Sequence, residues 1–376
     1  MKDKKMKIAI EALGIHYFGG GRTATLNLFE ALFALDTRNE YLIFLSQPEP
    51  SLNTQTGNVT QRIAPLKNRF LLRIWAQLFL PSAVRGYDLV HFAKNLGVFG
   101  VSTRTVVTIY DMTTLVHPEL HPRFDVWYWR HIQRRTLQNA DKIIAISSTT
   151  ADDIHRFYKI PKVRLQVIYP AYAKHFKPAS PEEIAWIRER YGLLEEYILH
   201  VGRIDRKKNL TVLVRAFAEF RQRTAFKGKL VLVGEEYRKS RDTTLNPTIE
   251  QLGLKNEVLF TGRVPDGDLP ALYSGALVTI YPSLHEGFGL AHVEALACGS
   301  PLIASAAGAV REVLAEAATL LDTTSIETIA DALTRVTKDP NLRQEMQRRG
   351  LAHVKQFQGE HSARQTLQLY EELVLR

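Results

Sequence analysis

The chain has 376 residues, of which 45% are hydrophobic and 23% charged, a composition typical of folded globular proteins and long enough for two domains. No stretch approaches the roughly 20 apolar residues that a membrane-spanning helix needs, and the start MKDKKMKIAIEAL lacks the apolar run of a signal peptide. The single cysteine, Cys298, excludes an internal disulfide framework. We therefore expect a cytoplasmic protein.

The net charge of +10 lies entirely in the first half of the chain. Residues 1–176 contain 23 Lys and Arg against 13 Asp and Glu, whereas residues 177–376 contain 26 of each. A basic half attracts nucleic acid, an anionic membrane surface or phosphorylated substrates, although a merely solvated surface can carry the same charge. Because no nucleic-acid-binding module accompanies the charge, we expect no nucleic-acid partner.

Short apolar runs alternate with longer amphipathic stretches along the whole chain. In the first half, strands are predicted at residues 7–13, 41–46, 88–92, 104–110, 142–147 and 164–169, with helices at about 22–35, 68–80, 125–138 and 148–158. In the second half, strands are predicted at residues 197–202, 229–234, 257–262, 276–281 and 301–305. Strands that alternate with helices form parallel sheets covered on both faces. The sequence therefore predicts an α/β protein of two doubly wound, Rossmann-like domains.

A linker is predicted at AYAKHFKPASPEE, residues 171–183, which contains two prolines, polar residues and no apolar period. The predicted domains are residues 1–177 and 178–359. In doubly wound sheets, ligands bind beyond the carboxyl ends of the strands. We therefore expect a site in the cleft between the domains, built by motifs that directly follow strands.

The turn Gly19-Gly20-Gly21-Arg22 follows the first strand and opens the first helix. Glycines there let the backbone approach a ligand, and a helix N-terminus favours an anion. The spacing fits neither a nucleotide P-loop nor the dinucleotide-binding G-x-G-x-x-G. Gly20 and Gly21 are therefore candidates for binding an anion or a sugar, with a simple flexible turn as the alternative.

Two segments of the first half are candidates for binding an acceptor. NRFLLRIWAQLFLP, residues 68–81, would suit a membrane surface, although a core helix is the favoured interpretation. RFDVWYWRHIQRR, residues 123–135, combines aromatic rings that stack on sugars with arginines that pair with phosphates. Together with the basic charge, they predict an anionic acceptor, such as a lipid-diphosphate saccharide, and peripheral binding to an anionic membrane.

The loop VGRIDRKKNL, residues 201–210, repeats the strand–loop–helix arrangement in the second half. Arg203 follows a strand and Lys208 precedes the next helix. A planar guanidinium and a point charge on one loop suit a diphosphate, and a solvated charge run is the alternative.

The pair Asp266 and Asp268 resembles a metal-binding Asp-x-Asp. It precedes a predicted helix with Pro270 in its first turn, where acidic residues cap the helix and suit its dipole. The histidines form no ligand spacing such as H-E-x-x-H. We therefore expect no metal site.

The stretch SLHEGFGLAHVEALACGSP, residues 283–301, places Glu286 before a glycine turn and Glu294 after it. The apolar pattern predicts a helix that starts near Leu290 and stops at Gly299. Free N–H groups at the start of that helix favour an anion, and Glu294 lies about 6 Å along it.

This layout matches a nucleotide sugar, in which a diphosphate lies between two sugars. Backbone amides would hold the phosphates, and the carboxylates would accept hydrogen bonds from hydroxyls on both sugars. A glycosidase pair of acid and nucleophile or base is the competing interpretation, but a hydrolase has no need of a phosphate-binding turn between its carboxylates. Glu294 as a plain helix-surface residue also remains open.

E-G-F-G-L with a second glutamate eight positions after the first, followed by A-x-A-C-G-x-P, resembles the E-x7-E signature of glycosyltransferase family 4, which has the GT-B fold. Further segments are also similar to that family: GR-x4-KN at residues 202–209, the GGGR turn, and residues 117–122, 141–147 and 311–322. The resemblance implies retaining transfer from a nucleotide sugar, such as GDP-mannose or a UDP-hexose, without a metal or other cofactor. It also implies a final helix, residues 360–376, that packs on the first domain.

The resemblance further implies roles for single residues. Glu286 would hold the donor sugar together with the amides of the turn, Gly287, Phe288 and Gly289, which leads into Leu290. Arg203 and Lys208 would stabilise the diphosphate, and Glu294 would bind the ribose hydroxyls.

One pair departs from the family pattern. Many relatives have His-Asp after the strand at 104–109, where this chain has Tyr110-Asp111. A tyrosine, with a pKa near 10, is a poor proton acceptor at neutral pH. Tyr110 and Asp111 remain first-domain candidates.

The sequence thus predicts a hexosyltransferase of polysaccharide or glycolipid synthesis. The alternatives are a non-catalytic nucleotide or glycan binder and an isomerase or phosphorylase of the same fold.

Overall fold

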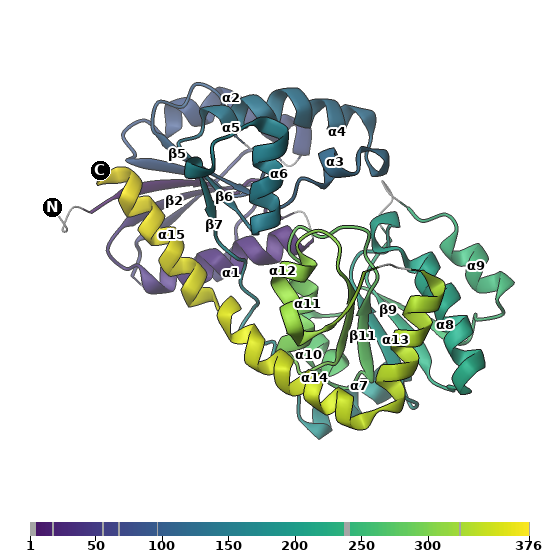
Figure 1. Ribbon diagram of the computed structural model, residues 1–376. Coiled ribbons are helices and arrows are strands. Elements are labelled where there is room, and N and C mark those ends of the chain that lie inside the picture. Colours follow the sequence, from purple (N-terminus) through teal and green to yellow (C-terminus); the bar gives the residue numbers. More distant parts are fainter. Residues whose placement is uncertain are drawn as a thin grey trace. The chain divides into compact units, whose positions relative to one another are not determined.

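The computed structural model describes residues 5–16, 19–54, 56–66, 68–95, 97–236, 241–322 and 325–375. The chain divides into two compact units (Figure 1). Unit 1 comprises Met1–Tyr172 together with Phe357–Arg376, and unit 2 comprises Ala173–Gln356. The predicted boundaries after residues 177 and 359 lie within a few residues of these limits.

Unit 1 is built on a seven-stranded parallel sheet with the order β3-β2-β1-β4-β5-β6-β7. Its strands are β1 (Lys7–Glu11), β2 (Glu40–Leu45), β3 (Val59–Ile63), β4 (Leu89–Phe92), β5 (Arg104–Ile109), β6 (Lys142–Ala145) and β7 (Leu165–Val167). Because successive side chains of a strand point to opposite faces, Ile8 and Ile10 enter one core and Ala9 the other. The sheet is therefore covered on both sides.

Helices cover the two faces of this sheet. One core is completed by α1 (Gly20–Leu35) and α15 (Gly359–Val374). The other is completed mainly by α2 (Arg69–Ala83), α5 (Arg134–Asn139) and α6 (Ser148–Tyr158). Between β5 and α5 the chain forms α3 (Thr113–Val116), α4 (Arg123–Tyr128) and the π-helical segment Trp129–Gln133.

The C-terminal helix α15 is fixed to the sheet of unit 1 by a buried polar chain. His91 on β4 is fully buried, and its Nδ1 lies 2.5 Å from the Tyr370 hydroxyl. Its Nε2 lies 2.7 Å from Thr108 Oγ1. Burial lowers the pKa of His91 to about 3, so the ring is neutral and can donate one of these hydrogen bonds and accept the other.

Unit 2 is built on a six-stranded parallel sheet with the order β10-β9-β8-β11-β12-β13. The strands are β8 (Tyr197–Val201), β9 (Lys229–Val233), β10 (Val258–Gly262), β11 (Val278–Tyr281), β12 (Leu302–Ser305) and β13 (Thr319–Leu321). The helices are α7 (Pro181–Arg190), α8 (Leu210–Thr224), α9 (Leu245–Gln251), α10 (Leu269–Ser274), α11 (Leu290–Ala297), α12 (Val310–Leu314), α13 (Ile326–Lys338) and α14 (Pro340–His353). In both units the first six strands of the unit have the order 3-2-1-4-5-6.

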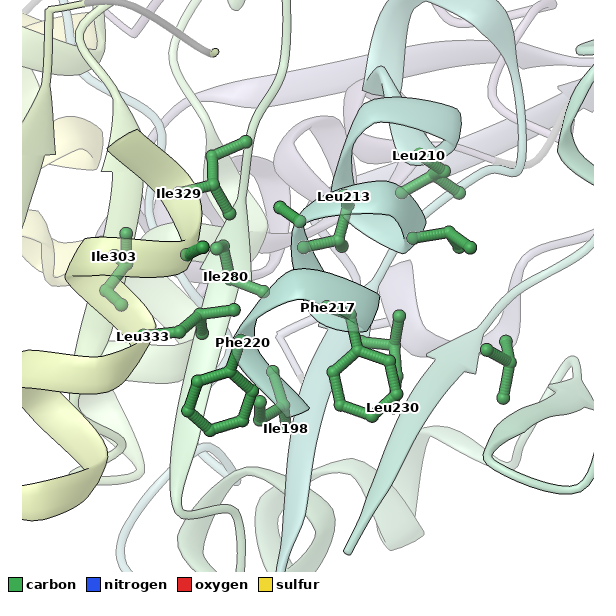
Figure 2. Packing of buried hydrophobic residues seen from close by; sticks show 14 of the residues in the cluster. Ile198, Leu210, Leu213, Phe217, Phe220, Leu230, Ile280, Ile303, Ile329 and Leu333 are labelled. Carbon is green, nitrogen blue, oxygen red and sulfur yellow. The ribbon is translucent and has the colours of Figure 1, made fainter. Parts of the chain in front are cut away.

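A large core of unit 2 lies between its sheet and helices α8 and α13. Figure 2 shows Phe217 and Phe220 of α8 packed with Ile198, Leu230 and other aliphatic side chains of the sheet. Burial of each such side chain contributes roughly 1.5–3 kcal/mol.

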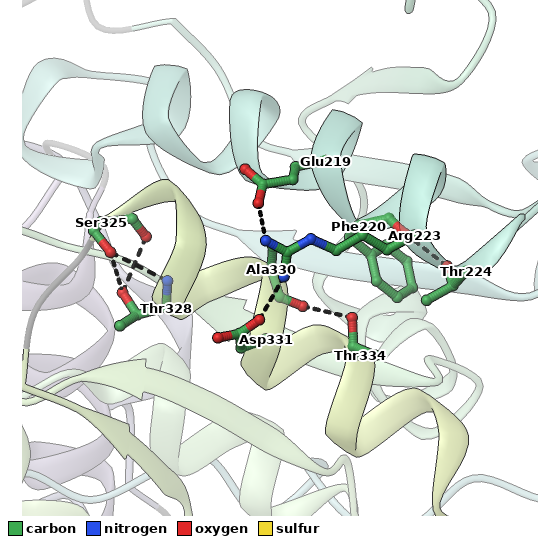
Figure 3. Close-up of polar contacts among 9 residues, drawn as sticks. All are labelled: Glu219, Phe220, Arg223, Thr224, Ser325, Thr328, Ala330, Asp331 and Thr334. Carbon is green, nitrogen blue, oxygen red and sulfur yellow. Dashed lines mark hydrogen bonds and ion pairs between the residues drawn. The ribbon is translucent and has the colours of Figure 1, made fainter.

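Polar contacts at the solvent side join the same two helices. Arg223 of α8 bonds both Glu219 of its own helix and Asp331 of α13, the latter at 2.5 Å (Figure 3). Ser325 caps α13, and its Oγ accepts the N–H of Thr328 at 3.1 Å. The position of α13 is thus set by apolar packing and by its N-terminal cap.

Two edge strands escape the sequence prediction, β3 because it is polar and exposed and β13 because it is very short. Strand β3 reads VTQRI and is half exposed, and β13 has only three residues. The predicted linker, residues 171–183, overlaps the first turn of α7, where Ser180 and Glu183 form a capping box. Within the described residues, no helix is long and apolar enough to cross a bilayer.

Candidate active site

The carboxyl edge of the unit 2 sheet brings three loops together. The Leu284 N–H, after β11, donates to the Lys207 carbonyl, after β8, at 2.9 Å. The Ala309 N–H, after β12, donates to the Glu286 carbonyl at 2.9 Å, and Glu286 pairs with Gly308 as an isolated parallel bridge. The backbone around Glu286 is therefore held from both sides.

Two of the contacts in this region require glycine. Gly308 has φ +64°, and a Cβ there would lie 2.2 Å from the Glu286 carbonyl oxygen. A Cβ on Gly234 would lie 1.9 Å from the Gly202 carbonyl oxygen. Neither distance is sterically possible, so these glycines permit the close approach of neighbouring loops.

The side chains of Lys208 and Glu286 form a largely buried ion pair. Lys208 Nζ lies 2.6 Å from Glu286 Oε1, and Lys207 Nζ lies 3.7 Å from Oε2. Burial raises the pKa of Glu286, but the two lysines and His292 outweigh it and hold that pKa well below its usual range. Glu286 is therefore ionised at neutral pH, with cations on one side and the glycine turn on the other.

Lys208 is positioned by a short 3₁₀ turn, Arg206–Lys208. The Asp205 carboxylate accepts the Lys208 N–H at 3.3 Å, and Asn209 follows in the left-handed conformation before α8 starts. Arg203 lies on the same loop with an exposed side chain. The loop thus combines the largely buried cation of Lys208 with exposed cations such as Arg203.

Helix α11 starts at Leu290 and its regular part ends at Ala297, so the predicted start is confirmed. Gly289 precedes it with φ +88°, and Gly299 follows it with φ +72°. The Ser300 N–H donates to the Ala295 carbonyl, and the Gly299 N–H donates to the Leu296 carbonyl. These two hydrogen bonds form the Schellman pattern of a helix end. The stop at Gly299 is confirmed as well.

Glu294, in the second turn of α11, is buried rather than a surface residue. Burial raises its pKa to about 8, and the nearby charge of Asp266 adds to the effect. Glu294 is therefore largely protonated at neutral pH, so it can donate one hydrogen bond and accept others. The sequence suggested a carboxylate at this position and could not foresee this state.

A buried aromatic cluster beneath the turn was also missed. Tyr281, at the end of β11, stacks on His292 of α11 at 4.1 Å and meets the edge of His200 of β8 at 5.1 Å. Burial lowers the pKa of His200 to about 3 and that of His292 to about 4, so both rings are neutral. Three aromatic rings from three elements cannot be paired by sequence spacing alone.

The carboxyl edge of the unit 1 sheet carries the first-half candidates. The Tyr110 hydroxyl lies 2.6 Å from Thr25 Oγ1, which donates to the Gly21 carbonyl at 2.6 Å. Gly20 opens α1, and the Asp111 carboxylate accepts the Thr113 N–H at 3.1 Å. Burial raises the pKa of Tyr110 to about 12 despite its bond to Thr25, so it stays protonated. Gly21 and Tyr110 are thus brought together, whereas Asp111 caps its own turn.

Two further charged residues at this edge were not identified from the sequence. Glu11 ends β1, and burial raises its pKa to about 7, although its carboxylate accepts the Leu13 N–H at 2.9 Å. Lys94 follows β4 and donates to the Gly14 carbonyl at 3.0 Å. A Cβ on Gly21 would lie 3.3 Å from Lys94. A glutamate within the otherwise apolar predicted strand 7–13 was the signal that could have marked Glu11.

In the Asp266–Asp268 pair, Asp268 has a structural role. The Asp268 carboxylate accepts the Tyr191 hydroxyl at 2.6 Å and lies 3.3 Å from the Arg190 guanidinium. Its side chain makes no capping hydrogen bond to α10, so the predicted capping role is wrong for this residue. No group of three or more His, Cys, Asp and Glu side chains suited to a metal gathers anywhere in the described part of the chain.

Two Rossmann-type sheets, with an ion pair beyond the strands of the second, agree with the expected GT-B fold of a glycosyltransferase. Residues 188–353 match the family described as Glycosyl transferases group 1, and residues 18–173 match Glycosyltransferase Family 4. These two matches together support a glycosyltransferase of the family 4 type, as the E-G-F-G-L segment suggested.

Named relatives and solved structures agree with this assignment. O-antigen chain mannosyltransferase B of Escherichia coli is 29% identical over 333 residues, 87% of each chain. Anabaena Alr3699/HepE, solved with UDP and glucose, has a TM-score of 0.78 at 20% identity and covers 99% of this chain and 100% of its own. Sucrose-phosphate synthase from Thermosynechococcus elongatus has a TM-score of 0.79 at 23% identity over 99% and 100% of the two chains. The GT-B fold and the transferase class are therefore confirmed.

The candidate residues fall into two groups. The first group lies at the carboxyl edge of the unit 2 sheet and contains Glu286, Lys208 and the turn Gly287–Leu290. Glu294 follows in helix α11, which starts at Leu290. Gly20, Gly21, Tyr110 and Asp111 lie in unit 1. The site between the domains remains a prediction.

Proposed function

We propose that the chain transfers a hexose, with mannose the first candidate, from a nucleoside-diphosphate sugar to a saccharide or lipid-linked acceptor in cell-surface polysaccharide synthesis. The observation that carries this proposal is the Lys208–Glu286 pair, 2.6 Å apart at the start of α11. The similarity to an O-antigen mannosyltransferase supports the sugar and the process, and the likeness to a protein solved with UDP and glucose supports a nucleotide-sugar donor.

The chemistry follows from the charges at this edge. Departure of the nucleoside diphosphate leaves extra negative charge on the phosphates, which Lys208, Arg203 and the free N–H groups of α11 would stabilise. Because Glu286 is ionised, it would accept hydrogen bonds from the donor sugar. Glu294, largely protonated, would bind ribose hydroxyls. The reaction would proceed with retention and without a metal, since the cations of the chain supply the electrostatic stabilisation.

The acceptor side of the proposal concerns unit 1. The excess of 10 positive charges lies in residues 1–176, most of which belong to unit 1. We place an anionic or lipid-linked acceptor there and the working enzyme at the face of an anionic membrane.

A thermal-shift and turnover panel tests the proposal. The full chain is heated with GDP, UDP, GDP-mannose, UDP-glucose and UDP-galactose, because a ligand that binds only the folded state raises the melting temperature. We expect the matching donor to raise it and to be consumed with release of free nucleoside diphosphate. A chain that neither binds nor consumes any of these donors would overturn the proposal.

Two finer readouts use the same assay. The anomeric configuration of the product, measured by NMR, is expected to equal that of the donor, and inversion would overturn the retaining mechanism. Activity is expected to survive EDTA, and a loss that Mg²⁺ restores would overturn metal independence.

A further inference from the structure

Unit 1 carries an apolar surface that its own fold leaves uncovered. Five large side chains of α2 are between 42% and 67% exposed: Phe70, Leu71, Ile74, Leu78 and Phe79. On α4, Phe124 is 62% and Trp127 50% exposed, and their rings stack at 5.9 Å. We call these seven side chains the α2–α4 face. The other exposed large hydrophobic residues of the described chain are distributed over many different elements.

The favoured interpretation of residues 68–81 as a core helix holds for one side of α2, and the exposed side chains occupy the rest of it. Only one side of α2 is buried, by Leu72, Ala76 and Leu80. Of the outward residues, Phe70, Ile74 and Leu78 form one row at i, i+4 spacing, and Leu71 and Phe79, eight positions apart, lie on the neighbouring row. Apolar residues therefore cover most of the helix apart from the row of Arg73 and Gln77. Sequence alone cannot tell which side of such a helix is covered.

Helices α2 and α4 belong to one continuous surface. Both pack on the same side of the unit 1 sheet. The Arg73 guanidinium of α2 lies 4.9 Å from the ring centre of Tyr128 on α4. The Gln77 side chain fixes α2 further by two hydrogen bonds, of 3.0 and 3.1 Å, with the Phe99 backbone. The α2–α4 face is therefore a held surface rather than two independent helices.

Cations accompany this face and acids are nearly missing from it. Four arginines of the stretch 123–135 are exposed: Arg123, Arg130, Arg134 and Arg135. Asp125 is the single acidic residue in that stretch, and the α2 sequence RFLLRIWAQLFLPSA contains none. Aromatic and aliphatic residues next to arginines form the pattern of a surface that lies on an anionic bilayer.

We propose that the α2–α4 face inserts its apolar side chains into the headgroup region of an anionic bilayer while Arg123, Arg130, Arg134 and Arg135 bind lipid phosphates. A second copy of the chain is the less favourable occupant, because a symmetric contact would bring like-charged arginines together. The inference goes beyond the donor chemistry of unit 2 and rests on the proposed function only for its biological purpose, which is access to a lipid-linked acceptor.

Vesicle flotation of the full chain tests this inference at 0.15 M salt. The two vesicle types are pure phosphatidylcholine and phosphatidylcholine with 30% phosphatidylglycerol. We expect at least tenfold tighter binding to the anionic vesicles. The variant Phe70→Ser/Leu78→Ser should weaken that binding at least tenfold, and Arg134→Glu/Arg135→Glu should remove the preference for anionic lipid. Thermal melting of each variant checks that it is folded.

A matched control replaces exposed apolar residues outside the face. Val163→Ser/Leu194→Ser removes side chains that are 78% and 83% exposed and is expected to bind vesicles like the wild type. Three outcomes overturn the inference: equal or no binding to the two vesicle types, wild-type binding by Phe70→Ser/Leu78→Ser, or a dimer in light scattering that this variant dissociates. Donor consumption is measured separately, so failure of membrane binding and failure of the proposed function are distinguishable.

Discussion

The two sheets of this protein share one strand order, yet their carboxyl edges differ in electrostatics. At the edge of unit 2, Glu286 is ionised and paired with Lys208 at 2.6 Å. At the edge of unit 1, Glu11 has a pKa raised to about 7 and Tyr110 one raised to about 12. The same scaffold therefore carries an ionised carboxylate beside two lysines in one unit, and a carboxyl group and a phenol with raised pKa values in the other. The loops, rather than the sheets, determine the chemistry.

The largest effect on transfer is expected from removing the cation that pairs with Glu286. Lys208→Ala takes away the partner of Glu286 and a stabilising charge for the leaving diphosphate, so transfer should fall by about two to three orders of magnitude. Lys207→Ala is the matched control, because its Nζ lies farther from Glu286, at 3.7 Å. Initial transfer rates measure both. An equal loss in the two variants would contradict a special role for Lys208.

A smaller but still large effect is expected from the backbone that holds Glu286. Gly308→Ala would place a Cβ 2.2 Å from the Glu286 carbonyl oxygen and should displace that residue and reduce transfer more than tenfold. Gly192→Ala introduces the same φ of +64° but meets nothing within 4 Å. Each variant stores about 1–2 kcal/mol of left-handed strain. Only Gly308→Ala should lose activity beyond that, and similar activity in both would argue against the positioning of Glu286.

The pH dependence of stability should separate the two kinds of carboxyl group. Burial raises the pKa of Glu294 to about 8 and that of Glu11 to about 7. In the folded chain these two groups therefore keep their protons at pH values where the unfolded chain has lost them. The free energy of unfolding should therefore fall between pH 5 and 8, by on the order of 2–4 kcal/mol for each group. Glu294→Gln and Glu11→Gln should each flatten that decline in denaturant titrations.

Glu286 should behave in the opposite sense. Its pKa is lowered, so its contribution to stability is present above about pH 4.5 and is lost as the pH falls below that value. Glu286→Gln should therefore alter the acid side of the stability profile and leave the range from pH 5 to 8 unchanged. A change confined to pH 5–8 would mean that Glu286 is not the ionised partner of Lys208.

The smallest effect on transfer is expected from a substitution at the carboxyl edge of the unit 1 sheet. Tyr110→Phe removes one hydrogen bond to Thr25 Oγ1, which still donates to the Gly21 carbonyl, so unit 1 should lose about 1 kcal/mol of stability. Affinity for the free nucleoside diphosphate, measured by calorimetry, should not change. Transfer should fall less than tenfold, because a protonated tyrosine is no general base at neutral pH. A loss as deep as that of Lys208→Ala would place the decisive chemistry at Tyr110.

Local patterns in the sequence were sufficient to predict most elements and the motifs that follow them. The glycine at 289, the apolar run after it and Gly299 define α11 within a few residues, so its start and end could be read directly. Alternating strands and helices likewise predicted two parallel sheets. The edge strand β3 is too polar to show an apolar period, and β13 has too few residues to show one.

Contacts between distant segments could not be predicted in the same way. Lys208 and Glu286 are 78 positions apart, and only the order of the strands brings their loops together. Lys94 lies beside Gly21 of the glycine turn because β4, the fourth strand in the chain, pairs with β1. Protonation states such as that of Glu294 depend on burial, which is a property of the folded chain.

The place of α15 in unit 1 has a consequence for synthesis of the chain on the ribosome. Residues 173–356 are made between the main part of unit 1 and this helix, which takes about 10–40 seconds at typical rates of translation. During that interval His91 has no Tyr370 hydroxyl to bond, and one face of the nascent sheet is without the helix that later covers it. The first unit to emerge is thus the last to be completed, and a chaperone that shields this face would have its longest opportunity there.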